Sequence, residues 1–249
     1  MGALFGIPSL EDITISNATV FHFRTSCGRL TRLPHDGKTS LRRLRWIRGL
    51  VSSKALEQIL QFPSQLEEIT LRLDHEWPHV GGPWPSRRDW WNITRAISDC
   101  QPNIRCLDIK TPLRDRRKHV LYLACFRSLT SYIGPDRWLA RHTQYGCRQG
   151  LPASITTLEL EYSCKPRLCE CCEPRLCACC KPSLATTLSA VRSLPNLKHI
   201  RYAVTAEGLS ETFRDWCKQA GVELFCLYSD GSGSEEHNAY APGWYWRKA

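Results

Sequence analysis

A short pattern of apolar and polar residues is the clearest feature of this chain. In Leu66–Leu73 the apolar residues Leu66, Ile69, Leu71 and Leu73 follow an L-x-x-L-x-L spacing. The alternation over its second half is typical of a short strand with one buried face. The same spacing recurs along the chain, weakly in the middle and for the last time in Val222–Leu227. The central apolar residues of these predicted strands are Ile13, Leu44, Ile69, Leu107, Tyr132, Leu158, Ile200 and Phe225.

The distances between these central residues indicate a repeat. The successive steps are 31, 25, 38, 25, 26, 42 and 25 residues. A base period of about 25 residues lies within the range of leucine-rich repeats. Four of the predicted strands follow a proline that would end a preceding helix, namely Pro63, Pro102, Pro152 and Pro195. We therefore predict an α/β fold, a right-handed leucine-rich-repeat solenoid with a curved parallel sheet, one helix per repeat and about seven to eight repeats.

The pattern divides the chain into three regions. Residues 1–40 are expected to form an irregular N-terminal repeat or cap, residues 41–228 the solenoid, and residues 229–249 a flexible tail. Near its end, Trp244–Trp246 either folds back onto the last repeat or forms an exposed patch. The predicted helices begin after Ser52 or Ser53 and from Ser86, and continue over His119–Phe126, over 184–194 and over 213–220.

The step of 38 residues is explained by an insertion at 74–86. This segment is rich in Pro, Gly, Trp and His and has neither helix nor strand periodicity. It is a recognition loop that presents Trp77 and Trp84 to a partner, or the two tryptophans pack over the sheet edge. A third interpretation is metal binding by its acidic and histidine side chains.

The step of 42 residues is explained by a second insertion, at 164–182. It contains a tandem duplication, PRLCECCE followed by PRLCACCK. Thiolates bind soft metals, so Zn or Cu could be held there, or the segment is a repeat expansion without a role. Apart from this candidate site we expect no cofactor. Its candidate ligands are Cys169, Cys171, Cys172, Cys177, Cys179 and Cys180.

Charge adds a second candidate function. The 249 residues carry a formal net charge of +10, and Arg24–Arg48 holds eight basic residues against Asp36 alone. Such a patch could bind nucleic acid through phosphate contacts. Later strands carry acidic residues such as Glu68 and Glu159, which oppose that interpretation.

The sequence lacks the signals that are typical of several classes of protein. No secretory signal is visible, and the apolar runs are too short for a membrane span. Gly37-Lys38-Thr39 resembles the end of a phosphate-binding loop, but Arg32 stands where that loop requires glycine. The motifs G-x-S-x-G, H-E-x-x-H and G-x-G-x-x-G are absent. We therefore expect a non-enzymatic, monomeric, intracellular protein, cytoplasmic or nuclear, with reduced thiols.

The units LEEITLRL, IRCLDIK, LPASITTLELEY and LPNLKHIRYAV resemble the leucine-rich repeats of fungal F-box-type proteins, over most of residues 40–228. The Asn that usually follows the core is replaced by Asp74, Ser163, Thr205 and Asp230, and an F-box is not found. The resemblance implies an array that holds a protein partner, as the substrate receptor of a ubiquitin ligase does. A cullin-ligase adaptor would then be a further partner.

Side chains between the core leucines of a parallel sheet face away from the core. They define the predicted partner-binding surface, to which Trp77 and Trp84 of the first insertion would add. A mixed-charge surface of this kind suits a protein epitope. Its strand residues are Arg43, Arg45, Glu68, Thr70, Asp108, Glu159 and Arg201.

Overall fold

The computed structural model describes residues 7, 9–20, 39–72, 87–110, 123, 125–136, 139, 151–161, 181–205, 209–229 and 244–249. The fold is α/β, with mostly parallel strands and helices in the connections between them. The chain divides into two compact units, Met1–Leu129 and Thr130–Ala249, here called unit 1 and unit 2.

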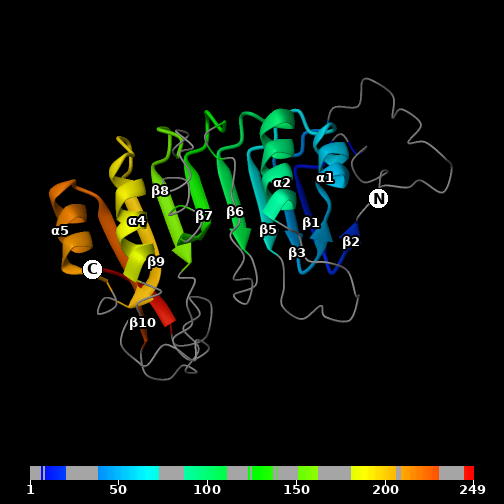
Figure 1. Cartoon of the computed structure of the whole chain (residues 1–249). Helices are drawn as coiled ribbons and strands as arrows, with labels where there is room; N and C mark the ends of the chain where they lie inside the picture. Colours follow the sequence, from blue (N-terminus) through cyan, green and yellow to red (C-terminus); the bar gives the residue numbers. More distant parts are fainter. Residues whose placement is uncertain are drawn as a thin grey trace. The chain divides into compact units, whose positions relative to one another are not determined.

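Unit 1 is built on four parallel strands in the order β1 (Asp12–Ser16), β3 (Arg43–Ile47), β5 (Glu68–Arg72) and β6 (Cys106–Lys110) (Figure 1). Each strand pairs with the next without a shift in register. One row across the sheet is therefore Ile13, Leu44, Ile69 and Leu107, which are all buried. These are the central residues that the spacing predicted.

An irregular repeat or cap was expected over residues 1–40, but the described residues there include regular strands. After β1 and β3 the chain continues into two short parallel strands, β2 (Thr19–Val20) and β4 (Leu50–Val51). Between the strands, Asn17 and Arg48 both have a φ of 56°, in the left-handed region. The offset is 31 residues throughout, so 12–20 and 43–51 are two copies of one structural unit.

Two helices lie side by side on one face of unit 1, α1 (Ser53–Leu60) and α2 (Arg87–Cys100) (Figure 1). Ser52 caps α1, because its hydroxyl accepts the Ala55 N–H at 3.2 Å. Gln101, the residue that follows α2, is buried. Its amide donates to the carbonyl oxygens of Leu60 and Pro63, both at 2.7 Å. The end of α2 is thus tied to the end of α1.

Unit 2 has four parallel strands, β7 (Ser131–Pro135), β8 (Thr157–Glu161), β9 (His199–Thr205) and β10 (Glu223–Ser229), in that order. The buried row is Tyr132, Leu158, Ile200 and Leu224.

The predicted central residue Phe225 is therefore wrong by one position. Val222, Leu224 and Cys226 are buried in strict alternation. In the other predicted strands, two residues separate the first two apolar positions. In this last strand only one residue separates them, so Phe225 points to the opposite face.

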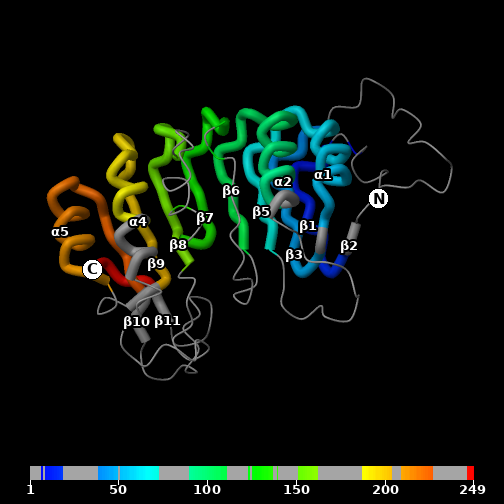
Figure 2. Tube along the Cα trace, viewed as in Figure 1, coloured from blue at the N-terminus to red at the C-terminus, as the bar shows by residue number. Residues whose placement is uncertain are grey.

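Helices α4 (Lys181–Arg192) and α5 (Glu211–Gln219) belong to unit 2. Ser210 caps α5, and Gly221, with a φ of 67°, follows its end, as the sequence predicted for a stop. The flexible tail predicted over 229–249 differs from the structure at 244–248. These residues form β11 (Trp244–Lys248), which pairs antiparallel with β10, so this part of the chain folds back onto the edge of the sheet (Figure 2).

The helix predicted over His119–Phe126 is wrong for the part that the structure describes. Leu123, Cys125 and Phe126 are not helical. Their backbone hydrogen bonds close turns of two or three residues, from Phe126 N–H to Leu123 O and from Arg127 N–H to Cys125 O. Leu123, Phe126 and Leu129 are all buried, so their i, i+3 spacing arises from successive turns and not from a helix.

One backbone hydrogen-bond arrangement recurs where the strands begin. The carbonyl oxygen that precedes a strand accepts two consecutive N–H groups of the next strand, as when Glu67 O accepts Arg105 N–H at 2.8 Å and Cys106 N–H at 3.0 Å. These two hydrogen bonds to one carbonyl oxygen fix the register of the neighbouring strands before the strands begin. The other acceptors of the same kind are Glu11, Arg42, Thr130 and Thr156.

The insertion at 74–86 lies outside the described residues, and α2 begins at Arg87, directly after it. Of the second insertion, 164–180 also lie outside the described residues. Lys181 and Pro182 belong to α4 and not to the insertion.

Substitution of Gly49 tests the packing of the two copies in unit 1. The indole Nε1–H of the buried Trp46 donates to Ala18 O at 2.9 Å, and a Cβ on Gly49 would overlap that carbonyl. We expect Gly49→Ala to lower the free energy of unfolding by about 3 kcal/mol through overpacking and loss of this bond. Gly221→Ala adds only left-handed strain in open space, about 1 kcal/mol. Urea unfolding measures both, and equal losses would contradict the overlap.

Candidate functional site

The candidate site is the face of the strands opposite the buried rows, here called the open face. In β1 and β3 the burial alternates along the strand, so the intervening side chains point away from the core. In unit 1 the open face has three rows because the four strands share one register. From the start of the strands these rows are Asp12, Arg43, Glu68 and Cys106; Thr14, Arg45, Thr70 and Asp108; and Ser16, Ile47, Arg72 and Lys110.

An exposed ion pair occupies the first row. The Arg43 guanidinium lies 2.5 Å from the Asp12 carboxylate on β1, and both side chains are about half exposed. On its other side Arg43 lies opposite Glu68 of β5. Arg43 is therefore placed between two acidic residues.

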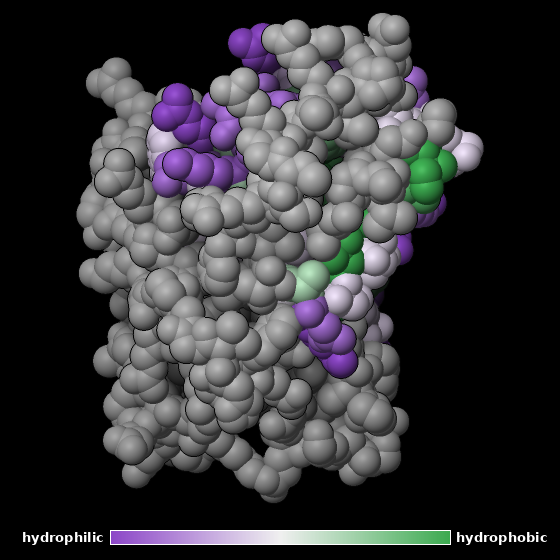
Figure 3. All heavy atoms as spheres, turned by 90° about the vertical axis from the view of Figure 1, so that its right-hand side faces the viewer, coloured by the Kyte–Doolittle hydropathy of each residue, from purple (hydrophilic) through white to green (hydrophobic). Residues whose placement is uncertain are grey.

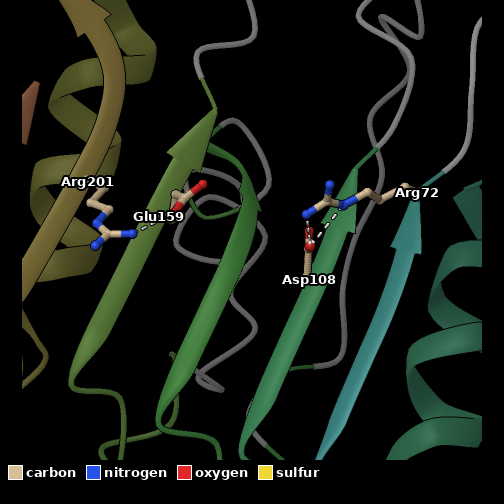
Figure 4. A network of polar contacts seen from close by, with 4 residues as sticks. All are labelled: Arg72, Asp108, Glu159 and Arg201. Atoms are coloured by element: carbon tan, nitrogen blue, oxygen red, sulfur yellow. Dashed lines mark hydrogen bonds and ion pairs between the residues drawn. The ribbon is translucent and has the colours of Figure 1, made fainter. Parts of the chain in front are cut away.

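A second ion pair connects two rows and is partly buried. Arg72 Nε and Nη2 both donate to Asp108 Oδ2, at 3.1 Å and 2.7 Å (Figure 4). Arg72 reaches from β5 toward β6, and its side chain is 39% exposed. Asp108 was predicted as part of an exposed surface, but only 3% of it is exposed. Its carboxylate therefore serves to hold Arg72 in place.

Unit 2 repeats this arrangement with different residues. Glu159 on β8 is 8% exposed, and its Oε2 lies 3.6 Å from Arg201 Nη1 of β9 (Figure 4). Glu159, like Asp108, is therefore less accessible than the sequence predicted. In each unit a buried carboxylate on one strand holds an arginine that extends from its neighbour.

Glu223 is the centre of a second cluster on the open face of unit 2. Its Oε1 accepts Lys248 Nζ of β11 at 2.7 Å, and its Oε2 lies 3.0 Å from His199 Nδ1 of β9. The hydrogen bond and charge of Lys248 lower the pKa of Glu223 below its ordinary value, with a smaller contribution from His199. One carboxylate thus connects three neighbouring strands.

The structure brings the predicted strand residues together within each unit. Arg43 lies opposite Glu68, Arg45 and Thr70 lie in one row with Asp108, and Glu159 lies opposite Arg201. Trp77, Trp84 and the six cysteines Cys169, Cys171, Cys172, Cys177, Cys179 and Cys180 lie outside the described residues.

Sequence reasoning missed several open-face residues. Arg72 and Glu223 continue the period-2 alternation, which could have identified them. Lys248 is placed there by β11, which the composition of the tail did not reveal.

The described cysteines are thiols that pack in the interior or near it. Burial raises the pKa of Cys217 to about 12 and that of Cys226 to about 11. Neither is a reactive thiolate at neutral pH. Within the described ranges, no three His, Cys, Asp or Glu side chains come together as a metal site.

Apolar side chains contribute little to the described surface. Where burial is defined, Ile7 is the one large apolar residue that is exposed, at 42%. On the face that Figure 3 shows, the coloured residues include hydrophilic ones and a few hydrophobic ones. Among the helices that the structure describes, none combines the length and the apolar character that a bilayer span needs.

Comparisons with protein-family models, with curated proteins and with solved structures find no significant match to this chain.

Substitution of Arg72 tests the buried pair of unit 1. Arg72→Met leaves the buried Asp108 carboxylate without its guanidinium, so we expect the free energy of unfolding to fall by about 1–3 kcal/mol. Arg43→Met is the matched control, because its pair with Asp12 is exposed and should contribute less than about 1 kcal/mol. Chemical denaturation of both variants provides the comparison. A smaller loss for Arg72→Met than for Arg43→Met would contradict the assignment.

The Glu223 cluster predicts a pH dependence. Because the folded pKa of Glu223 lies below its unfolded value, its contribution to stability is present above the unfolded pKa. That contribution is lost as the pH falls through the lower, folded pKa. NMR titration of the side-chain carboxyl carbon should show the lowered pKa, and Lys248→Met should move it back toward its ordinary value. An unchanged pKa in that variant would contradict the contact.

Proposed function

We propose that this chain is a non-enzymatic protein-binding module of the leucine-rich-repeat type, which holds a partner on the open faces of its strands. The observation that carries the proposal is the ordered arrangement of charge there. Neighbouring parallel strands place acidic and basic side chains in register, and ion pairs fix several of them in position. A preformed polar pattern favours recognition of a complementary protein surface.

The distribution of apolar residues supports the same proposal. The apolar positions of the repeat pattern lie in the core, and the open face of unit 1 carries mostly charged and hydroxyl side chains. Charged surfaces contribute association rate and specificity more than affinity. We therefore expect rapid, salt-dependent binding.

Nucleic-acid binding through the basic segment 24–48 is less well supported. Four of its basic residues lie outside the described residues, namely Arg24, Arg29, Arg32 and Lys38. Among the described ones, Arg43 is neutralised by Asp12 and lies opposite Glu68. Arg42 precedes β3 and Arg48 follows it in the left-handed turn. The acids beside Arg43 would repel a phosphate backbone, whereas a protein epitope with both signs of charge can match them.

A role as substrate receptor of a ubiquitin ligase is a narrower form of the proposal. It rests on the resemblance of the repeat units to fungal F-box-type proteins, and a cullin-ligase adaptor would be a second partner. The capture experiment that follows separates it from a free-standing binding module.

Affinity capture tests the proposed surface. The tagged chain is expressed in its native cell type, captured at moderate salt with nuclease, and analysed by quantitative mass spectrometry. We expect one stoichiometric protein, whose recovery falls at least tenfold in the variant Arg45→Glu. The matched control is Lys54→Glu, which reverses an exposed charge on helix α1 and should leave recovery unchanged.

Other outcomes have defined meanings. Recovery that is equal in both variants would show that the partner binds elsewhere. Co-purification of a cullin adaptor would favour the substrate-receptor form. Enrichment of ribonucleoproteins only when nuclease is omitted would overturn the protein-binding proposal in favour of nucleic acid.

A further inference from the structure

The middle row of the open face of unit 1 holds an arginine between two threonines. Arg45 on β3 lies opposite Thr14 of β1 and Thr70 of β5. Neighbouring strands are about 4.8 Å apart, so both hydroxyls lie beside the arginine side chain. A hydroxyl can donate one hydrogen bond, and a guanidinium donates five in a planar fork. These three side chains therefore place hydrogen-bond donors in adjacent positions of one row on the open face.

Arg45 differs from the other two arginines on this face. Arg43, two residues earlier on the same strand, is paired with Asp12, and Arg72 is paired with Asp108. No acid stands next to Arg45 in its own row, and Arg45 forms no ion pair with any residue that the structure describes. Its charge remains available to a ligand.

We propose that Arg45, with Thr14 and Thr70, forms a carboxylate-binding centre that takes an Asp or Glu side chain of an acidic segment of the partner. This inference rests on the proposed protein-binding function and names the chemistry of the partner. A carboxylate matches the guanidinium fork with two parallel hydrogen bonds, which are stronger than neutral ones. The net charge of +10 adds a long-range attraction for an acidic segment.

The neighbouring ion pairs favour a carboxylate over a phosphate group. A phosphorylated side chain carries about −1.5 to −2 charges and is usually bound by a cluster of arginines. Here the two other arginines are already neutralised by Asp12 and Asp108, whose carboxylates would repel a second negative charge. One free guanidinium with two hydroxyls matches a singly charged carboxylate.

Peptide selection tests this centre directly. A displayed library of random twelve-residue peptides is panned on the full chain at moderate salt, and the affinities of selected peptides are measured by fluorescence anisotropy. We expect the selected peptides to be enriched in Asp and Glu relative to the library. Arg45→Gln should weaken their binding by about tenfold or more, as expected for loss of charge-assisted hydrogen bonds.

Two variants serve as controls. Arg43→Gln removes an arginine of the same strand and face whose charge is already neutralised, so we expect less than about a threefold change. Arg45→Lys keeps the charge but loses the fork, and its affinity should lie between those of wild type and Arg45→Gln. Circular dichroism of each variant establishes that the fold is retained.

The inference and the proposed function fail in different ways. Selected peptides without acidic enrichment, or with equal losses for Arg43→Gln and Arg45→Gln, would overturn the carboxylate centre and leave protein binding intact. Much tighter binding of a selected peptide after phosphoserine replaces its Asp or Glu would assign the site to phosphate and also overturn it. If no peptide is selected and the capture experiment yields no protein, both proposals are wrong.

Discussion

In-register parallel pairing of the strands is the constraint on which the candidate surface depends. Each strand of unit 1 begins at the same level as its neighbour, because one carbonyl oxygen accepts two N–H groups of the next strand. With no shift in register, every residue of a strand has a fixed neighbour on each side. A shift by one residue would bury the arginines and expose the leucines. The burial of one row therefore determines the chemistry of the row on the opposite face.

This constraint explains how much of the fold could be predicted from the sequence. Within each strand the buried positions follow one spacing, and most strands recur after a base period of about 25 residues, so the central residues of seven strands were found from spacing alone. The last strand was misread at Phe225 because Val222 and Leu227 happen to complete an L-x-x-L-x-L spacing. Burial alternates there from Val222 to Cys226 instead. Spacing alone could not distinguish these two registers.

Features outside the repeat could not be found in this way. Strand β11 pairs through backbone groups with an available sheet edge. Fold-back of Trp244–Trp246 was one of two alternatives, and the aromatic residues alone could not decide between them. The turns at Leu123–Leu129 mimic helical spacing because three successive turns also bury every third residue. Sequence reasoning identified part of the open-face residues but not their pairing. That pairing depends on rotamers, which alternation does not specify.

The buried acidic residues of the two units show that the role of an arginine depends on its ion-pair partner more than on the amino-acid composition of the surface. A buried ion pair is weak evidence for stability, because apolar residues of similar size often replace it without loss. Asp108 and Glu159 therefore contribute most by holding Arg72 and Arg201 in defined positions across the strands. An arginine held in this way is fixed in position by its carboxylate, whereas Arg45 lies between two threonines and forms no ion pair with a described residue. The neighbour on the next strand thus decides whether an arginine is fixed within the sheet or is left as a candidate for binding.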